Sequence, residues 1–551
     1  MQRAFSGTGI RAAEEPLLRT GQGPVLMQRA AHGLANAVAR LLAERRGRVY
    51  GARIVLLAGP GNNGGDALYA ASFLLHRGAR ATAVLSSAGA HEQALEAFRR
   101  AGGRTHTLPG PEEDTVNGPT DDNGSRAPAA IAAQVWLAEA AAADVLIDAI
   151  LGTGARGSLR APWANAVRAL QQNAAAEKPG AFGKPNGPLI VACDLPSGVD
   201  ANTGELHEPV LTAGLTVTFG AAKTGLLAPP GEGASGRLQV IDIGLGHGLE
   251  DPVLRRLESG DLALLLPSPG RDEQKYTRGV LGVVAGSGQY PGAAQLSCAG
   301  ALACGTGMVR YLGPESVAAL IHLSSPEVVC SQGSVEGNHV QAWLVGPGIG
   351  EAGESDVKEQ LQRCRDAYAS GLPVVADAGA LAVLPAQLSE GTAPHVILTP
   401  HAGELAQLFQ RLGRDVSRPQ IEAQGMHFAV EAAKLTGATV LLKGATTLVA
   451  SPSGSVFSQS EGTPWLATAG SGDTLAGIIG ALLAALAAQT SGFSALGIPA
   501  EDRWAAIAAA GASLHGRAGV LASAGGPLHA AALAAAVPEV WRKLYAPGPV
   551  T

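Results

Sequence analysis

Cysteine and aromatic residues are scarce in this chain, which has five cysteines and 4% Phe, Trp and Tyr among its 551 residues. The cysteines are scattered, with no C-x-x-C pair, so they argue against a disulfide framework or a thiolate zinc site and favour a reducing compartment. Every long apolar stretch is interrupted by glycine, proline or charge, and the first residues lack the apolar core of a signal peptide. We therefore expect a cytoplasmic protein that does not span a membrane.

Basic clusters are also absent, and the formal net charge is −6. This balance argues against nucleic acid or a membrane surface as a partner and leaves small molecules as the expected ligands. The sequence has no G-x-x-x-x-G-K-[ST] loop. Any nucleotide must therefore be held by a different device.

What the sequence does contain is a regular alternation of short apolar runs with segments of helical period. This alternation is typical of parallel sheets with helices on both faces, and the chain is too long for one core. We expect an α/β fold of two three-layer, doubly wound domains, residues 1–246 and 247–551, and read the polar segments 108–128 and 177–187 as surface loops. The predicted strands lie near 53–58, 80–85, 144–148, 188–193, 215–219, 238–242, 280–285, 342–346, 373–376, 395–399, 439–442 and 446–450.

A glycine-rich turn, LLAGPGNNGGDAL at 56–68, places Gly59, Gly61 and Gly64 at the G-x-G-x-x-G spacing of a Rossmann-like dinucleotide site. An NAD cofactor site also needs an acid about 20 residues further on, to hold the ribose hydroxyls. No acid occurs between Asp66 and Glu92. The turn therefore suits a dinucleotide that is not used as a redox cofactor, and a dehydrogenase is disfavoured.

Oxygen-bearing side chains follow three strands of the first domain, at Asn63, Asp148, Asp194 and Ser197. The carboxyl ends of strands in a doubly wound sheet share one crevice, so these groups are expected to converge. Amide, hydroxyl and carboxylate oxygens suit a weakly charged hard cation such as potassium, and one aspartate remains free for proton transfer. The alternative is that the aspartates cap the following segments and that the Asn-Gly and Pro-Ser-Gly pieces are turns.

Taken together, NNGGD, DAILGTG, CDLPSGVD and GAAKTG resemble the NAD(P)H-hydrate epimerase domain over about residues 8–245. The resemblance implies that Asp194 is the acid/base residue. It also implies that potassium (K+) is held by Asn63, Asp148 and Ser197. The residues implied to line the hydrated dinucleotide are Asn62, Asn63, Gly64, Gly65, Asp66, Gly152, Thr153, Gly154, Ala155, Arg156, Gly157, Ser158 and Asp194.

In the second domain, ATAGSGD precedes an apolar helix expected to begin at or just after Gly472-Asp473. Free N–H groups at a helix start suit a phosphoryl group, and Asp473 beside them suits acceptance of a hydroxyl proton. The alternative is that Asp473 is an N-terminal cap. Lys443, at a strand end, is placed to meet phosphates, although it also fits a solvated strand end. His401 suits either substrate contact or a structural turn.

These pieces, with KYTRG at 275–279, GSGQYPGAA, GPGIG, DAGAL at 377–381 and TPHAGE, resemble the ADP/ATP-dependent NAD(P)H-hydrate dehydratases of the ribokinase-like superfamily over about residues 260–520. The family pattern is DADAL, so Gly379 replaces an acid. The resemblance implies a magnesium (Mg2+) requirement and hydrate contacts from Ala293, Gly350, His401 and Asp473. The implied adenine-nucleotide contacts are Lys443, Gly444, Ala445, Thr446, Thr447 and Gly472.

The two resemblances predict one repair reaction. The first domain would interconvert the R and S hydrates of NADH and NADPH, and the second would dehydrate the S form at the expense of ADP, giving AMP and phosphate. ATP remains open as the donor, and we expect a homo-oligomer. The alternatives are a ribokinase-like small-molecule kinase and a first domain that only senses nucleotides without catalysis.

Overall fold

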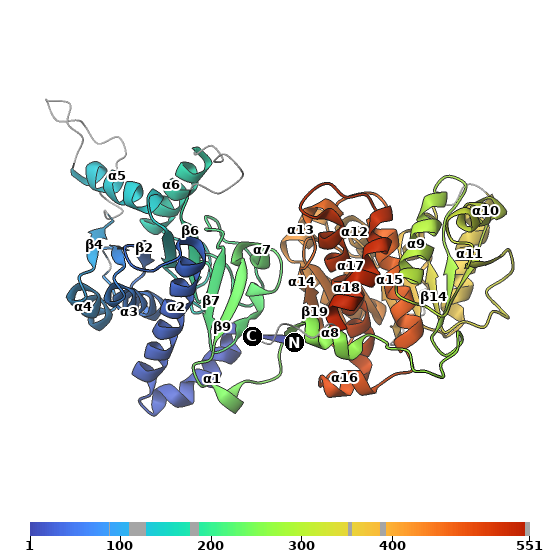
Figure 1. Ribbon diagram of the computed structural model, residues 1–551, viewed down its shortest axis with the longest axis horizontal. Coiled ribbons are helices and arrows are strands. Elements are labelled where there is room, and N and C mark those ends of the chain that lie inside the picture. Colours follow the sequence, from blue (N-terminus) through green and yellow to red (C-terminus); the bar gives the residue numbers. More distant parts are fainter. Residues whose placement is uncertain (88, 109–127, 177–186, 351–354, 386–392, 546–551) are drawn as a thin grey trace. The chain divides into compact units, whose positions relative to one another are not determined.

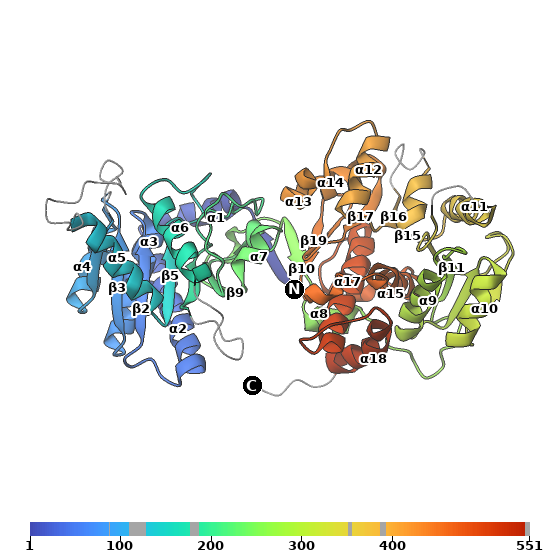
Figure 2. The same cartoon turned by 90° about the horizontal axis from the view of Figure 1, so that it is seen from above.

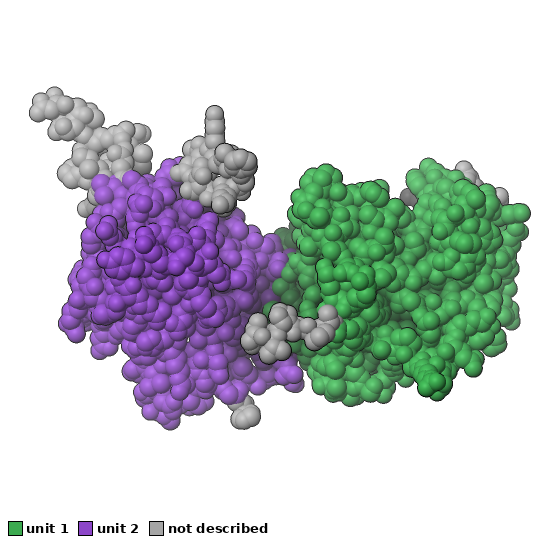
Figure 3. All heavy atoms as spheres, in the orientation of Figure 1, with its two compact units in different colours: residues 1–2, 254–551 green, residues 3–253 purple. Residues whose placement is uncertain are grey.

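The computed structural model describes residues 1–87, 89–108, 128–176, 187–350, 355–385 and 393–545 (Figure 1). It divides into an N-terminal unit, residues 3–253, and a C-terminal unit, residues 1–2 with 254–551 (Figure 3). The chain thus passes from one unit to the other at Val253–Leu254, a few residues after the expected position. The expected surface loops at 108–128 and 177–187 lie almost entirely outside the described residues.

The N-terminal unit is built on a parallel sheet in the order β4-β3-β2-β5-β6-β7-β9. The strand order reverses between β2 and β5, which is where doubly wound proteins bind ligands. The strands are β4 (Arg104–Thr107), β3 (Arg80–Leu85), β2 (Arg53–Ala58), β5 (Val145–Ala149), β6 (Leu189–Cys193), β7 (Leu215–Phe219) and β9 (Arg237–Ile241), with β1 (Gln2–Phe5) paired to β8 (Ala222–Lys223). The helices are α1 (Gly7–Arg19), α2 (Gly23–Arg46), α3 (Asn62–His76), α4 (Glu92–Arg100), α5 (Pro128–Ala141), α6 (Trp163–Ala176) and α7 (Gly231–Ser235), with short 3-10 turns η1 (Thr224–Leu226) and η2 (Gly246–Gly248).

Both faces of this sheet are covered, as the side chains of β2 demonstrate. Ile54 and Leu56 belong to a core shared with α2 and α3, whereas Val55 and Leu57 belong to a core that includes Trp136 of α5 and Trp163 of α6. Successive residues of a strand point to opposite faces, so a continuous apolar run is what a sheet buried on both sides requires.

The C-terminal unit contains the strand order β13-β12-β11-β14-β15-β16-β17-β18-β19-β10. Its strands are β10 (Leu254–Arg256), β11 (Val280–Val284), β12 (Met308–Leu312), β13 (Val329–Ser331), β14 (Ala342–Val345), β15 (Val374–Ala376), β16 (Ala393–Leu398), β17 (Ala438–Leu442), β18 (Thr447–Ala450) and β19 (Val456–Gln459). The sheet is parallel from β13 to β17, as the sequence predicts, but β18 pairs antiparallel with both β17 and β19. Only Lys443 to Thr446 join β17 to β18, and a parallel crossover needs a connection about three times longer.

Helices cover both faces of this sheet too: Figure 2 shows α11, α12 and α14 on one side of the strands and α9, α17 and α18 on the other. The central helix α15 contacts both α9 and α17. The helices are α8 (Ser259–Leu265), α9 (Pro291–Ala303), α10 (Glu315–Ser324), α11 (Ser355–Ala369), α12 (Ala402–Arg411), α13 (Arg418–Ala423), α14 (Gly425–Thr436), α15 (Ser471–Leu486), α16 (Ser491–Ala495), α17 (Arg503–Ser523) and α18 (Ala531–Tyr545), with 3-10 turns η3 (Ala378–Val383), η5 (Pro464–Leu466) and η6 (Ala500–Asp502). Within the described ranges, no helix is long and apolar enough to span a bilayer.

Candidate active sites

A cavity of about 560 Å³ opens in the N-terminal unit at the point where the strand order reverses. One wall comes from α1 and α2, and the opposite wall comes from the turns that follow β2, β5 and β6. The polar and glycine residues that line it are Arg11, Glu14, Gly23, Gly61, Asn62, Asn63, Asp66, Gly152, Thr153, Gly154, Asp194 and Lys223.

The turn between β2 and α3 depends on two of its glycines. A Cβ atom on Gly59 would lie 1.9 Å from the carbonyl oxygen of Ile150, and one on Gly64 would lie 2.0 Å from that of Gly59. Helix α3 then begins at Asn62 with no side-chain cap on its first N–H groups. Uncapped N–H groups at a helix start favour phosphate, as a dinucleotide ligand requires.

Asp194 follows β6 in a left-handed backbone conformation, with φ of 69°. Non-glycine residues rarely adopt this region, and such strain gathers at functional sites. The side chain is buried, and its carboxylate accepts hydrogen bonds from the Lys223 ammonium and from the hydroxyls of Thr153 and Thr218. Burial raises the pKa of Asp194, but the Lys223 charge and the hydrogen bonds from Lys223 and Thr153 outweigh it, so the net pKa lies below the usual value.

Two further carboxyl groups face the same cavity, and their pKa values shift the other way. Burial, followed by the charges of Asp194 and Glu14, raises the pKa of Asp66 well above its usual value. Burial also raises the pKa of Glu14, against the opposing charge of Lys223. The cavity therefore combines an ionised aspartate with carboxyl groups that retain protons to higher pH.

The three residues expected to hold potassium meet around Leu151. The backbone N–H and hydroxyl of Ser197 donate to Asp148 at 2.8 Å and 2.6 Å. Leu151 donates its N–H to the Ser197 hydroxyl at 3.0 Å, and its carbonyl accepts from the Asn63 amide at 2.9 Å. The Asn63 Oδ1 atom is buried and has no hydrogen-bond partner among the described residues. A buried amide oxygen without a donor beside hydroxyl and carboxylate oxygens fits a weakly charged hard cation.

In the C-terminal unit, Asp473 lies in the first turn of α15, which begins at Ser471, slightly earlier than expected. The N-cap residue is Gly470, with φ of 87°, and no side chain caps the helix. Asp473 is therefore not the capping residue that the alternative interpretation supposed. Burial first, and then the charge of Asp377, raises the pKa of Asp473 to about 6, with Lys443 opposing.

Lys443 connects four segments that meet at the carboxyl ends of the parallel strands. Its ammonium lies 2.8 Å from Asp377, which follows β15, and 3.6 Å from Glu404 of α12. A Cβ on Gly472 would lie 3.7 Å from the same nitrogen, so the start of α15 adjoins it. Burial lowers the pKa of Lys443, but the Asp377 and Glu404 carboxylates raise it to a net value above the usual one. Lys443 is thus a fixed cation rather than a solvated strand end.

His401 is the N-cap of α12. Its Nδ1 atom accepts from the backbone N–H groups of Gly403 at 3.0 Å and Glu404 at 3.2 Å. Glu404 in turn accepts from the N–H of His401 at 2.8 Å, which completes a capping box. This capping role agrees with the interpretation of His401 as a structural turn residue. Its other ring nitrogen, Nε2, belongs to a side chain that is 57% exposed.

Loops that follow β11 and β14 pack against the first turn of α9. The Ser287 hydroxyl donates to the carbonyl of Gly348 at 2.9 Å, and a Cβ on Gly348 would lie 2.5 Å from that of Ala293. Gly379 approaches the same loop, because its Cβ would lie 2.3 Å from the carbonyl oxygen of Ile349. The backbone of this chain therefore fills the space that a side chain at position 379 would need.

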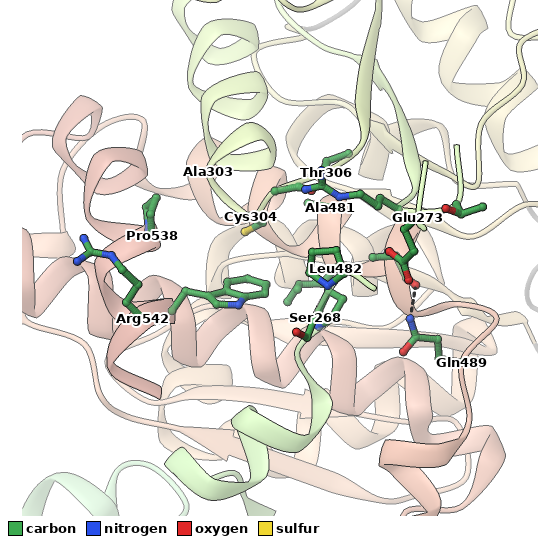
Figure 4. A pocket seen from close by; sticks show the side chains of 17 residues that line it. Ser268, Glu273, Ala303, Cys304, Thr306, Ala481, Leu482, Gln489, Pro538 and Arg542 are labelled. Carbon is green, nitrogen blue, oxygen red and sulfur yellow. Dashed lines mark hydrogen bonds between the residues drawn. The ribbon is translucent and has the colours of Figure 1, made fainter. Parts of the chain in front are cut away.

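A separate cavity of about 250 Å³ lies at the opposite end of α15 (Figure 4). Its lining combines apolar residues such as Leu482 and Trp541 with charged ones such as Glu273, Arg278 and Arg542. Helix α15 has 16 residues, so at 1.5 Å per residue about 24 Å separates its two ends. This cavity is therefore distinct from the cluster around Asp473.

Comparisons with known proteins match both halves of the chain. The NAD(P)H-hydrate dehydratase family matches residues 281–537, and the family described as YjeF-related protein N-terminus matches residues 23–225. The bifunctional NAD(P)H-hydrate repair enzyme Nnr of Mycobacterium tuberculosis is 40% identical over 88% of this chain and 89% of that protein. The chain belongs to the bifunctional NAD(P)H-hydrate repair enzyme family. The Nnr enzyme of Corynebacterium glutamicum is 31% identical over 88% of this chain and 87% of its own length.

Several solved structures are similar to about half of this chain. The ADP/ATP-dependent NAD(P)H-hydrate dehydratase from Bacillus subtilis, co-crystallised with ATP/Mg2+, is 27% identical with a TM-score of 0.43, over 52% of this chain and 97% of that one. A ribokinase-like superfamily protein from Enterococcus faecalis is 21% identical with a TM-score of 0.44, over 54% and 99%. The family resemblance predicted from the motifs is confirmed by the full-length relatives, which favour a repair enzyme over a small-molecule kinase.

The structure divides the expected site residues into two groups, one in each unit. In the N-terminal unit, Asn62, Asn63, Asp66, Gly152 to Ala155 and Asp194 line the large cavity. Other residues expected to contact the hydrate lie outside that lining, namely Gly64, Gly65, Arg156, Gly157 and Ser158. In the C-terminal unit, Gly444, Ala445 and Thr446 form the turn between β17 and β18, and Thr447 begins β18.

Sequence reasoning missed several charged residues of the two sites. Lys223 and Glu14 line the large cavity, and Asp377 and Glu404 hold Lys443. Lys223, Asp377 and Glu404 lie inside motifs that carried the resemblance, so the signal was present without an assigned role. Glu14 comes from α1, which contains no motif of its own.

Proposed function

We propose that this chain repairs hydrated nicotinamide dinucleotides in two steps, one in each unit. The N-terminal unit interconverts the R and S hydrates, and the C-terminal unit dehydrates the S hydrate with ADP as phosphoryl donor. The observation that carries the proposal is a pair of acidic centres, Asp194 and Asp473. Each lies close to an uncapped helix start that suits phosphate, and each belongs to the half that matches the corresponding part of the bifunctional relatives.

In the N-terminal unit, the first turn of α3 would bind the dinucleotide phosphates, and the cavity would hold the hydrated ring. Asp194 is ionised, so its carboxylate accepts the proton of the ring hydroxyl. Lys223 holds that carboxylate in place and stabilises its charge. Asn63, Asp148 and Ser197 would hold potassium, which when bound supplies positive charge near the substrate.

In the C-terminal unit, Asp473 would accept the proton of the hydrate's hydroxyl as its oxygen attacks the terminal phosphoryl group of ADP. The N–H groups at the start of α15 and the Lys443 ammonium stabilise the negative charge of the transferred group. AMP leaves as the hydrate's oxygen is phosphorylated. The ring nitrogen's electron pair then expels phosphate, and loss of a proton from the neighbouring ring carbon restores the dihydronicotinamide. The nearby carboxylates of Asp377 and Asp473 fit magnesium, which binds through one or two carboxylates and the nucleotide phosphates and neutralises phosphate charge.

Recovery of reduced-nicotinamide absorbance from mixed-epimer NADH hydrate tests both steps. The reaction is run in magnesium and potassium with ADP, ATP or no nucleotide. We expect complete recovery with ADP, recovery of only the S share in Asp194→Asn, and none in Asp473→Asn. Recovery with ATP but not ADP would reject the proposed donor, and no recovery with either from folded protein would reject the dehydratase.

Omitting potassium separates its proposed role from that of magnesium. We expect replacement of potassium by a larger organic cation to slow epimerisation while dehydration of pure S hydrate continues. The Asn63→Ala variant should lose this potassium dependence, because it lacks the unpartnered amide oxygen. Equal potassium dependence in the variant and the unaltered protein would reject the site.

A further inference from the structure

The large cavity holds more acidic groups than the proposed epimerisation uses. Glu14 comes from α1, Asp66 from the first turns of α3, and Asp194 from the end of β6. The cations that line the cavity with them are Arg11 and Lys223. Three carboxyl groups and two cations thus meet at one substrate-sized space, although only Asp194 has been given a chemical role.

Asp66 has surroundings opposite to those of Asp194. Its side chain is 9% exposed, and its Oδ1 atom is buried without a hydrogen-bond partner among the described residues. Asp194 instead accepts hydrogen bonds from Lys223, Thr153 and Thr218. A carboxyl group with a buried and unpartnered oxygen costs much more free energy as an anion than in its protonated, neutral form. The geometry therefore favours a neutral Asp66 beside an ionised Asp194.

Burial and the neighbouring carboxylates also favour a protonated Asp66. Burial is the largest influence that raises its pKa, followed by the carboxylates of Asp194 and Glu14, while Lys223 lowers it. The pKa of the Cys193 thiol is also raised, by burial first and then by the charges of Asp66 and Asp194. Two carboxyl groups whose surroundings move their pKa values apart are the usual arrangement of a catalytic acid and base.

We propose that Asp66 is the acid that works with Asp194 in epimerisation, donating a proton to the ring nitrogen while Asp194 takes the hydroxyl proton. This inference rests on the proposed epimerase function. As the O–H proton passes to Asp194, the O–H electrons form a carbonyl group at the hydrated carbon. The bond from that carbon to the ring nitrogen breaks, and its electron pair takes the proton of Asp66. Closure on the opposite face of the carbonyl reverses both transfers and returns both carboxyl groups to their starting states.

The test follows the loss of one pure epimer of NADH hydrate by chromatographic separation of the two, without nucleotide, so that dehydration does not occur. We expect Asp66→Asn to lower the kcat of epimerisation by at least about 100-fold, the usual contribution of a general acid, with little change in KM. The unaltered protein should lose activity at high pH, as Asp66 loses its proton, and the residual activity of Asp66→Asn should lack this alkaline limb.

Dehydration of pure S hydrate by the same Asp66→Asn protein is the matched control, because it depends on the other unit and should be unchanged. A raised KM with unchanged kcat would assign Asp66 to binding alone and overturn the inference. If Asp66→Asn does not fold, the pH profile of the unaltered protein decides, and the lack of an alkaline limb overturns the inference. If the unaltered protein does not epimerise at all, the proposed function fails rather than this assignment.

Discussion

Each unit contains a lysine whose ammonium lies against an aspartate at a strand end. Lys223 contacts Asp194 after β6, and Lys443 contacts Asp377 after β15. In the first unit the lysine keeps the acting carboxylate ionised, because burial alone would raise the pKa of Asp194. In the second unit the lysine is engaged by Asp377, and the acting Asp473 keeps a raised pKa. A lysine–aspartate ion pair is thus present in both units, but the pKa of Asp194 is lowered whereas that of Asp473 is raised.

Replacing Lys223 by Met should shift the pH dependence of epimerisation. Without the ammonium, burial dominates and the pKa of Asp194 rises. Asp194 acts as the ionised base, so the acidic limb of the pH–rate profile should move to higher pH, with a fall of at least about tenfold near neutrality. Epimerisation rates from pH 5 to 9 measure this shift, and dehydration of S hydrate by the same protein is the control. An unmoved acidic limb would contradict the assigned role of Lys223.

Asp473 predicts a different pH dependence for dehydration. Its pKa is raised to about 6, and it must be ionised to accept the hydroxyl proton, so the rate should fall as pH drops below about 6. Asp473→Asn should lower kcat by about 100-fold or more and abolish this limb. Initial rates with pure S hydrate and ADP from pH 5 to 8 check both expectations. Epimerase activity in the variant should persist, because it depends on the other unit, and thermal unfolding of the variant shows whether the C-terminal unit is folded.

At the scale of elements, apolar runs located the central strands well, whereas short or polar strands were missed. The predicted strands 53–58 and 80–85 match β2 and β3, because a strand buried on both faces is a continuous apolar run. Strand β12, MVRYL, was missed because Arg310 interrupts its apolar run, and β10 has only three residues. The antiparallel pairing of β18 depends on the length of a connection rather than on composition, so periodicity did not reveal it.

The β2–α3 turn offers a test of which glycines the fold requires. Gly59→Ala would place a Cβ 1.9 Å from the carbonyl oxygen of Ile150, so we expect the N-terminal unit to lose about 3 kcal/mol or more of unfolding free energy. Gly61→Ala is the matched control, because no atom lies within 4 Å of its Cβ and its φ of −87° suits alanine. Urea unfolding measures both variants. Equal stability of the two variants would show that the backbone contact at Gly59 is not limiting.

The loop around Gly379 shows why restoring the family's acid should not help. A Cβ at this position would lie 2.3 Å from the carbonyl oxygen of Ile349, on the segment that leads to Gly350. We expect Gly379→Ala and Gly379→Asp each to lower stability by about 1–3 kcal/mol and to slow dehydration without affecting epimerisation. Thermal unfolding and the two separate assays test this. A Gly379→Asp variant with normal stability and faster dehydration would contradict the steric explanation.

At the scale of the whole molecule, the sequence predicted two α/β units, and its motifs indicated which reaction centre each contains. It did not predict that the wall of the first cavity includes Arg11 and Glu14 of α1. These residues lie far along the chain from Asp66 and Asp194, and only the fold brings them together. Motifs therefore located the parts of each site that follow strands, whereas helices contributed residues that no local pattern identifies.

Because each unit is proposed to catalyse a different step, a mixture of two variants, each inactive in one step, tests whether the hydrate moves between molecules. Asp473→Asn keeps the proposed epimerase, and Asp194→Asn keeps the proposed dehydratase. Alone, the first should repair none of a mixed-epimer hydrate and the second only its S share. If the S hydrate leaves one protein and enters another through solution, an equimolar mixture of the two variants should restore complete recovery of NADH with ADP. Absorbance at the end point measures this, and each variant at twice the concentration is the control. Recovery that stays at the S share in the mixture would show that the hydrate must pass between sites of the same molecule.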